Sequence, residues 1–458
     1  MTHRFHPTLL REYDMRGVVG DTLGKADAYA LGRTFGTLVA RAGGSAVAVG
    51  RDGRLSSPML ETALVRGLVD SGVDALRIGL GPTPMLYFAQ AERDVMGGIQ
   101  ITGSHNPRDH NGFKLVFQRR PFFGEDIRKL GGQAAAGDWN EGAGRIETVD
   151  LMDAYATRLM QGFDGGAFRI GWDAGNGAAG PAVEKLTQLL PGEHHLLFTD
   201  IDGHFPHHHP DPSEERNLAD LKALVLGNKL DFGVAFDGDG DRIGVVDGKG
   251  RTIQGDQLLS IFAEDVLKDR PGATIIADVK ASQALFDRIE ALGGRPLMWK
   301  TGHSLIKSKM KQTGSLLAGE MTGHIFFADD YYGFDDGLYA AVRLIRAITR
   351  LGKSVTELRA AMPKMVNTPE LRFPVADSRK FAVVDEVLAR LRAMGAVLDD
   401  TDGARVRTDD GWWLLRASNT QDALVARVEA RDDAALERLI AELDSQLAES
   451  GVIRVCSE

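Results

Sequence analysis

The chain has 458 residues, of which 43% are apolar and 26% are charged, and a formal net charge of -10. These values are typical of a globular protein with several domains and exclude a disordered or fibrous chain. The acidic balance argues against a nucleic-acid binder, which needs a basic surface. No apolar run reaches the roughly 18 residues of a membrane span. The polar first residues resemble no secretory signal, and a single cysteine is typical of the reducing cytoplasm, so we expect a cytoplasmic protein.

The first part of the chain alternates predicted helices and strands. A helix is predicted at residues 26–42 and a strand at 46–50, and an amphipathic helix begins at Ser57. With a further strand at 73–78, the order strand, helix, strand indicates a parallel sheet. The stretch from Gly131 to Gly144 loses its periodicity and predicts a surface loop before a domain boundary near Thr148.

Two further units repeat this plan. Strands at 168–172 and 273–277 each lead to a helix, and each unit has a later strand that ends in a polar loop. Because ligands collect beyond the carboxyl ends of parallel strands, the polar loops of the three units are expected to face one cleft.

The last part differs from the first three. A strand at 370–375, a helix at 381–394, a hairpin at Asp410-Gly411 and a final helix at 434–447 predict an α+β module. We therefore expect three related α/β domains with mixed, largely parallel sheets and a C-terminal α+β domain. The predicted boundaries are residues 1–148, 149–251, 252–364 and 365–458.

Two polar loops indicate the chemistry. In the first, a strand ends in Thr102-Gly103-Ser104-His105-Asn106-Pro107, which displays one hydroxyl on a tight turn. A serine in such a loop is also an ordinary turn residue. In the second, Asp237, Asp239 and Asp241 alternate with glycines, and clustered carboxylates repel one another unless a cation neutralises them. A calcium hand loop is excluded because its sixth and twelfth positions would hold Arg242 and Gly248. Together the loops predict metal-assisted phosphoryl transfer through a phosphoserine.

Other candidate residues also follow predicted strands. Lys114, Arg242, Lys280 and His303 could neutralise phosphate oxygens, although each alone is more often a surface residue. Glu320, Thr322 and His324 offer acceptors for sugar hydroxyls, or merely end a strand. The set Arg416, Ser418, Asn419 and Thr420 offers donors to a phosphate, or forms a turn with a surface arginine. The run of histidines at 207–209 is interpreted as a polar loop and not as a zinc site.

Four motifs in order, at residues 102–107, 237–242, 319–324 and 416–420, resemble those of the α-D-phosphohexomutase family and its bifunctional phosphomannomutase/phosphoglucomutase group. The resemblance covers nearly the whole chain. It implies a heart-shaped protein with a central cleft and a last domain similar to the TATA-binding-protein fold. The implied activity is phosphoryl transfer between O1 and O6 of mannose and glucose phosphates, through a phosphoserine and a 1,6-bisphosphate.

The resemblance also implies a role for each site residue. The catalytic residues would be Ser104, Lys114, Arg242 and His303. One Mg²⁺ would be bound by Ser104, Asp237, Asp239 and Asp241. The substrate would be bound by Tyr13, Arg16, Lys280, Gly302, Glu320, Thr322, His324, Arg416, Ser418, Asn419 and Thr420. A hexose 1,6-bisphosphate would be the activator and intermediate, and the expected partners are small sugar phosphates, with no nucleic acid or membrane.

Three alternatives stay open from the sequence: a phosphoglucosamine mutase, a non-catalytic sugar-phosphate-binding paralogue and a metal-dependent phosphatase. The sequence departs from the family pattern at Thr322, where serine is usual, and at Gln421-Asp422, where a proline-containing continuation is usual. The departures leave the preference between mannose and glucose substrates open. The chain is expected to be a monomer or a weak homodimer.

Overall fold

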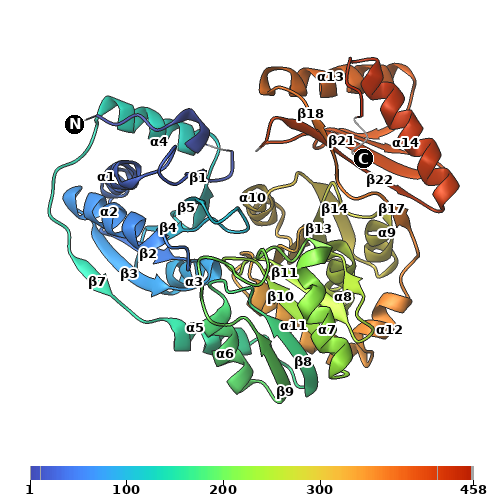
Figure 1. Ribbon diagram of the computed structural model, residues 1–458, viewed down its shortest axis with the longest axis horizontal. Helices are drawn as coiled ribbons and strands as arrows, with labels where there is room; N and C mark the ends of the chain where they lie inside the picture. Colours follow the sequence, from blue (N-terminus) through green and yellow to red (C-terminus); the bar gives the residue numbers. More distant parts are fainter. Residues whose placement is uncertain (1, 11, 420, 455–458) are drawn as a thin grey trace.

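The computed structural model describes residues 2–10, 12–419 and 421–454. They form four units, each built on its own sheet, and the units follow one another from the blue N-terminal unit to the red C-terminal unit (Figure 1). The predicted phosphate-binding residue Thr420 and the single cysteine, Cys456, lie outside the described residues. No helix of the described part combines the length and the apolar character needed to cross a bilayer.

Units one and two extend from β1 to β12. The elements of unit one are β1 (Met15–Val18), α1 (Lys25–Arg41), β2 (Ala46–Arg51), α2 (Ser57–Asp70), β3 (Asp74–Leu80), α3 (Thr83–Glu92), β4 (Gly97–Ile101), β5 (His110–Phe117), β6 (Arg120–Phe122), α4 (Glu125–Ala136) and β7 (Ile146–Thr148). Those of unit two are α5 (Met152–Met160), β8 (Phe168–Asp173), α6 (Gly180–Leu189), β9 (Gly192–Leu197), α7 (Ala219–Gly227), β10 (Phe232–Phe236), β11 (Ile243–Asp247) and β12 (Thr252–Ile253).

The last two units complete the chain. The elements of unit three are α8 (Gly255–Asp269), β13 (Thr274–Asp278), α9 (Gln283–Ala291), β14 (Arg295–Trp299), α10 (His303–Thr313), β15 (Leu317–Gly319), β16 (Ile325–Phe327), α11 (Gly337–Leu351) and α12 (Val355–Ala360). Those of unit four are β17 (Val366–Asn367), β18 (Leu371–Pro374), α13 (Asp377–Ala393), β19 (Val397–Asp399), β20 (Ala404–Arg407), β21 (Gly411–Ala417), β22 (Ala423–Ala430) and α14 (Asp433–Ala448).

The first three units share one topology, which confirms the predicted relation between them. Each has three parallel strands in the orders β3-β2-β4, β9-β8-β10 and β14-β13-β15. In each, the third of these strands then pairs with an antiparallel return strand, β5, β11 or β16. The three connections before the return strands hold Ser104, the three aspartates and Glu320. The chemistry-bearing loops are therefore topologically equivalent.

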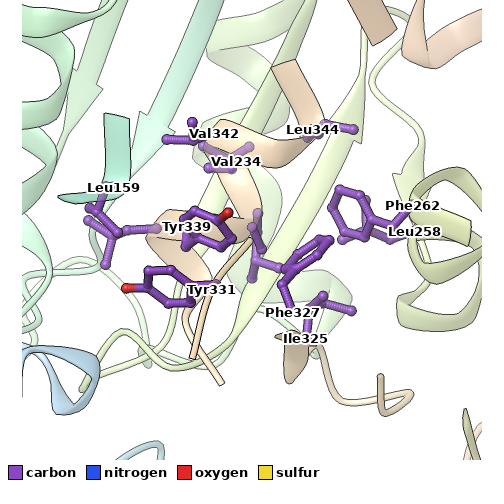
Figure 2. Packing of buried hydrophobic residues seen from close by; sticks show 14 of the residues in the cluster. Leu159, Val234, Leu258, Phe262, Ile325, Phe327, Tyr331, Tyr339, Val342 and Leu344 are labelled. Carbon is purple, nitrogen blue, oxygen red and sulfur yellow. The ribbon is translucent and has the colours of Figure 1, made fainter. Parts of the chain in front are cut away.

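One buried cluster runs through the first three units, although unit one also has a separate core that includes α1 and α2, and the fourth unit has its own core. Figure 2 shows part of this cluster, in which Tyr339 of α11 and Val234 of β10 lie between Leu159 of α5 and Phe262 of α8. The core of unit four lies between its sheet and the helices α13 and α14. Only a small cluster of Val279, Trp412 and Leu414 joins this unit to unit three by apolar packing among the described residues. The first three units are thus held together by a shared core, and the fourth is not.

Two details correct the predicted secondary structure. The expected loop at 131–144 is partly wrong, because α4 continues to Ala136. A Cβ atom on Gly131 would lie 2.7 Å from Leu10, so this glycine permits close packing within a helix and does not end it. The helix α3 was missed because nearly all of its residues are buried, and a helix that is buried on all sides has no amphipathic pattern to read.

Candidate active site

Ser104 lies in a strained and firmly held loop. Its φ of 49° is in the left-handed region, and its side chain is buried. The hydroxyl of Thr102 accepts a 2.8 Å hydrogen bond from the Ser104 amide. The guanidinium of Arg54 donates to four carbonyl oxygens of the loop, those of Ser104, Asn106, Pro107 and His110, at 2.6 to 2.9 Å. These bonds stabilise a backbone geometry that serine disfavours by itself.

The serine loop and the acidic loop touch. Ser104 Oγ donates to Asp237 Oδ2 at 3.0 Å. A Cβ atom on Gly238 would lie 2.5 Å from the Ser104 carbonyl oxygen, so only glycine permits this approach. The histidine run also contacts the loop, because His209 Nε2 lies 2.5 Å from the carbonyl oxygen of His105. The hydroxyl from unit one is therefore fixed beside the carboxylates of unit two.

Asp237, Asp239 and Asp241 are fully buried and offer oxygens that all lie within 4.8 Å of one another. Burial and repulsion by the other two carboxylates raise the pKa of Asp237 well above its usual value. Burial also raises the pKa of Asp241, with repulsion by Asp239 next in size. Burial would raise the pKa of Asp239 as well, but the ammonium of Lys114 lowers it below its usual value. The three carboxylates can therefore all be ionised only if positive charge lies beside them.

Lys114 supplies part of that charge. Its Nζ donates to Asp239 Oδ2 at 2.7 Å and also to Asp241 Oδ2. Burial would lower the pKa of Lys114, but the attraction of Asp239 and Asp241 raises it, so the side chain stays protonated. Within the described chain, Asp239 Oδ1 and Asp241 Oδ1 have no hydrogen-bond partner. Three buried carboxylates, one ammonium and two unused oxygens fit a hard divalent cation such as Mg²⁺.

Arg242 and two histidines border the acidic loop. The amide of Arg242 donates to Asp237 Oδ1 at 3.1 Å, and its Nε donates to His324 Nε2 at 2.9 Å. The ring of His303 stacks on that of His324 with centroids 5.5 Å apart. Burial, and then the charge of Lys307, lower the pKa of His303 well below its usual value, so its imidazole is neutral at pH 7.

The loop of unit three is held by backbone contacts. Glu320 Oε1 accepts a 2.5 Å hydrogen bond from the amide of Gly302, and burial raises the pKa of the Glu320 carboxyl. Gly302 has a φ of 130°, and a Cβ atom there would lie 2.7 Å from the ring of Tyr13. Thr322 is half-buried in the same loop. Lys280 Nζ lies 3.7 Å from Glu370 Oε2 of the fourth unit.

The loop of unit four meets unit one through Tyr13. Asn419 Nδ2 donates to the Tyr13 hydroxyl at 2.5 Å, and this hydroxyl donates to the carbonyl oxygen of Thr301 at 2.9 Å. Arg416 Nε donates to Asp402 Oδ2 at 2.9 Å. Ser418 is buried, and its Oγ accepts a hydrogen bond from the amide of Gln421.

The remaining predicted residue, Arg16, lies next to the serine loop. It donates to Asp14 Oδ2 at 2.8 Å and to Asn106 Oδ1 at 3.2 Å. The structure thus brings Ser104, the aspartates, Lys114, Arg242, His324 and His303 together by direct contacts. It links Tyr13, Gly302, Glu320 and Asn419 in a second set of contacts.

Three residues of the site escaped the sequence analysis. Arg54 lies in the connection between β2 and α2, directly after the polar strand end Arg51-Asp52-Gly53, which is a signal that the sequence offers. Thr83 donates to Asp239 Oδ2 at 2.5 Å from the beginning of the missed helix α3. Asp335 Oδ2 lies 2.9 Å from His324 Nδ1. Its one sequence signal is its position directly before Asp336, the residue that caps α11.

Models of four protein domains match the chain in order. They are described as phosphoglucomutase/phosphomannomutase alpha/beta/alpha domains I, II and III, at residues 7–139, 153–250 and 254–366, and as the C-terminal domain, at residues 370–446. A phosphomannomutase/phosphoglucomutase of Pseudomonas putida is 47% identical over 433 residues, which is 94% of both chains. A phosphoglucomutase of Neisseria meningitidis serogroup A is 43% identical over 440 residues, 94% of this chain and 95% of that protein.

The structural comparison agrees. A crystal structure of a phosphoglucomutase/phosphomannomutase family protein from Burkholderia thailandensis matches with a TM-score of 0.92 at 43% identity and covers 98% of both chains. A putative phosphomannomutase from Thermus thermophilus, at 23% identity and a TM-score of 0.82, covers 98% of this chain and 100% of that chain and shares the fold. Matches of this identity and coverage in all four units mean that the chain belongs to the phosphoglucomutase/phosphomannomutase family.

Proposed function

We propose that this chain is an enzyme that moves a phosphoryl group between O1 and O6 of mannose and glucose phosphates, through phosphoserine at Ser104 and a hexose 1,6-bisphosphate. The observation that carries the proposal is the 3.0 Å contact between Ser104 Oγ and Asp237, at the junction of two units. A hydroxyl beside a buried cluster of carboxylates is suited to carry a phosphoryl group only if a cation offsets the charge.

The proposed cation is one Mg²⁺, held by Asp237, Asp239, Asp241 and the phosphorylated Ser104. The unused oxygens of Asp239 and Asp241 support this donor set. When bound, such an ion neutralises charge on the phosphoryl oxygens and lowers the barrier to transfer.

The chain's own residues supply the proton transfers and the remaining charge. In the forward step, the free sugar hydroxyl loses its proton and forms a bond to phosphorus as the bond between phosphorus and Ser104 Oγ breaks. The neutral imidazole of His303 is suited to take that proton. Lys114 and Arg242 stay cationic and stabilise the oxygens between which the phosphoryl group passes. The second step runs in reverse from the other end of the bisphosphate.

Recognition of the sugar is proposed for the other loops. Glu320 and Thr322 would bind O3 and O4, and Arg416, Ser418, Asn419 and Thr420 would bind the phosphate that is not reacting. Tyr13, Arg16, Lys280, Gly302 and His324 would complete the site. The contact of Tyr13 with both Thr301 and Asn419 supports a site shared by three units.

The test is a coupled assay of the purified chain with glucose 1-phosphate and mannose 1-phosphate, with EDTA or Mg²⁺, and with a trace of the 1,6-bisphosphate. We expect isomerisation of both sugars that depends on Mg²⁺, and a phosphopeptide containing Ser104. Absence of isomerisation under every condition refutes the proposal. Release of inorganic phosphate would indicate a phosphatase, and faster turnover of glucosamine 6-phosphate than of both hexose phosphates would indicate a phosphoglucosamine mutase.

The setting of the enzyme is also proposed. Small sugar phosphates are the partners, and nucleic acid and membranes are not. A cytoplasmic location is supported by the single cysteine, and the chain is proposed to be a monomer or a weak homodimer.

A further inference from the structure

Asp335 lies next to His324, on the connection between β16 and α11, and is fully buried. Its Oδ1 accepts a 2.8 Å hydrogen bond from Lys307 Nζ. Its Oδ2 lies 2.9 Å from His324 Nδ1 and 3.6 Å from His303 Nδ1. Burial would raise the pKa of Asp335, but Lys307 and the hydrogen bond with His324 lower it well below its usual value, so the side chain is a carboxylate.

The contacts of His324 define its tautomer. Arg242 Nε can only donate, so His324 Nε2, at 2.9 Å, must accept. The proton of the neutral ring is then on Nδ1, which faces the Asp335 carboxylate. A carboxylate that binds one ring nitrogen of a histidine fixes both the tautomer and the orientation of the ring.

The same atoms also resemble a metal site, because Asp241, His324 and Asp335 offer ligand atoms within 4.8 Å of one another. That interpretation is disfavoured. Both ring nitrogens of His324 already face protein groups, and Lys307 occupies the other oxygen of Asp335. The arrangement is a row of closely spaced polar side chains that leads from Lys307 through Asp335 and His324 to Arg242.

We propose that Asp335 is a positioning residue of the transfer reaction, which acts through the tautomer of His324 to hold the Arg242 guanidinium beside the acidic loop. The inference rests on the proposed function. The alternative tautomer would place an N–H of His324 against the N–H of Arg242, and the guanidinium would have to turn away. The Arg242 amide would stay on Asp237, since that bond is made by the backbone.

The test compares Asp335→Ala, Asp335→Asn, Arg242→Met and the double variant Asp335→Ala/Arg242→Met in the coupled assay. The alanine variant loses the acceptor for His324, and we expect kcat to fall roughly 10- to 100-fold, with KM changed by less than about threefold. The asparagine variant can still accept through its amide oxygen and should retain more activity. In the Arg242→Met background, Asp335→Ala should change kcat by less than about threefold, because the residue acts through Arg242.

Asp329→Ala is the matched control for a purely structural effect. Asp329 is a buried carboxylate on the same connection, paired with Arg343 at 2.6 Å. We expect it to lower the melting temperature and to leave kcat within about twofold of wild type. If Asp335→Ala does not fold, the same cycle is run with Asp335→Asn. A wild-type kcat in the Asp335 variants, or equal losses with and without Arg242, would overturn the inference.

Selective ¹⁵N labelling of histidine gives a readout that does not need activity. The His324 signal, assigned by its loss in His324→Gln, should show protonation at Nδ1 in the wild type and lose that preference in Asp335→Ala. If the wild type transfers no phosphoryl group, the proposed function fails, and the tautomer still decides whether Asp335 orients His324. A His324 ring protonated at Nε2 in the wild type would overturn it.

Discussion

The loops of the first three units and the loop of the fourth are held in different ways. The first three follow equivalent strands over one shared core, and their charged side chains bind one another while buried. The fourth unit has a separate core. It is tied to the rest by Arg405, which donates to the carbonyl oxygens of Val279 and Ala281, and by the contact of Asn419 with Tyr13. The side chains proposed to react are therefore held in place before substrate binds, whereas the predicted phosphate loop depends on a few contacts between units.

The largest effect is expected at the reacting end, from Asp241→Asn. This change keeps the size of the side chain, removes one negative charge from the cluster and leaves Lys114 with one fewer carboxylate. Because charge stabilisation in such sites contributes most of the acceleration, we expect kcat to fall about 10³-fold for both sugars. The coupled assay at saturating Mg²⁺ measures it. A loss that affects only KM would mean that the loop binds substrate and does not carry the chemistry.

Removal of the Lys114 ammonium should destabilise the fold at the cluster of Asp237, Asp239 and Asp241. Lys114→Met leaves buried carboxylates without their cation, and we expect the free energy of unfolding in EDTA to fall by about 3–5 kcal/mol. Bound Mg²⁺ should restore part of this loss. Urea unfolding with and without Mg²⁺ checks both statements, with Lys114→Arg as the variant that keeps the charge. An equal loss of unfolding free energy in EDTA and in Mg²⁺ would show that Mg²⁺ does not bind at the acidic cluster.

The sequence located the serine loop and the acidic loop, which the structure places in contact, because each loop consists of contiguous residues. The serine turn and the alternating aspartates are local patterns, and strand periodicity located both loops. Arg54 and Asp335 were not predicted, since they reach the site from other segments and only tertiary packing brings them there. The helix α3 was missed for a related reason, because complete burial removes the polar face on which sequence patterns depend.

The shared core offers a pH-dependent test at Asp336. Its carboxylate accepts hydrogen bonds from Tyr155 of unit two and from Tyr331, and it caps α11. Burial raises its pKa from 3.8 to about 6, against the lowering effect of its hydrogen bonds. The folded state therefore binds a proton more tightly than the unfolded state does. Its contribution to stability is full below pH 3.8 and is lost as the pH rises through about 6.

Asp336→Asn should remove this dependence. Relative to the variant, the free energy of unfolding of the wild type should fall by about 3 kcal/mol between pH 3 and 8, of which about 1 kcal/mol lies between pH 5 and 7. Urea unfolding of both proteins at a series of pH values measures the difference. A difference that does not change with pH would show that Asp336 has an ordinary pKa and that the junction of units two and three is more hydrated than its burial indicates.

The smallest effect is expected where the fourth unit meets the first. Tyr13→Phe removes the hydroxyl that joins Asn419 to Thr301 and keeps the ring against Gly302. Of the two hydrogen bonds that are lost, only the one to Asn419 reaches the fourth unit, and one hydrogen bond corresponds to about 1 kcal/mol, so we expect KM to rise about fivefold with kcat within about twofold. Tyr29→Phe, which removes a hydroxyl bonded to Asp70 on α2, should leave both constants unchanged. Because both partners belong to one contact, Asn419→Ala should add little in the Tyr13→Phe background. A drop in kcat as large as that of Asp241→Asn would mean that the fourth unit is as firmly coupled to the reacting groups as the first three are to one another.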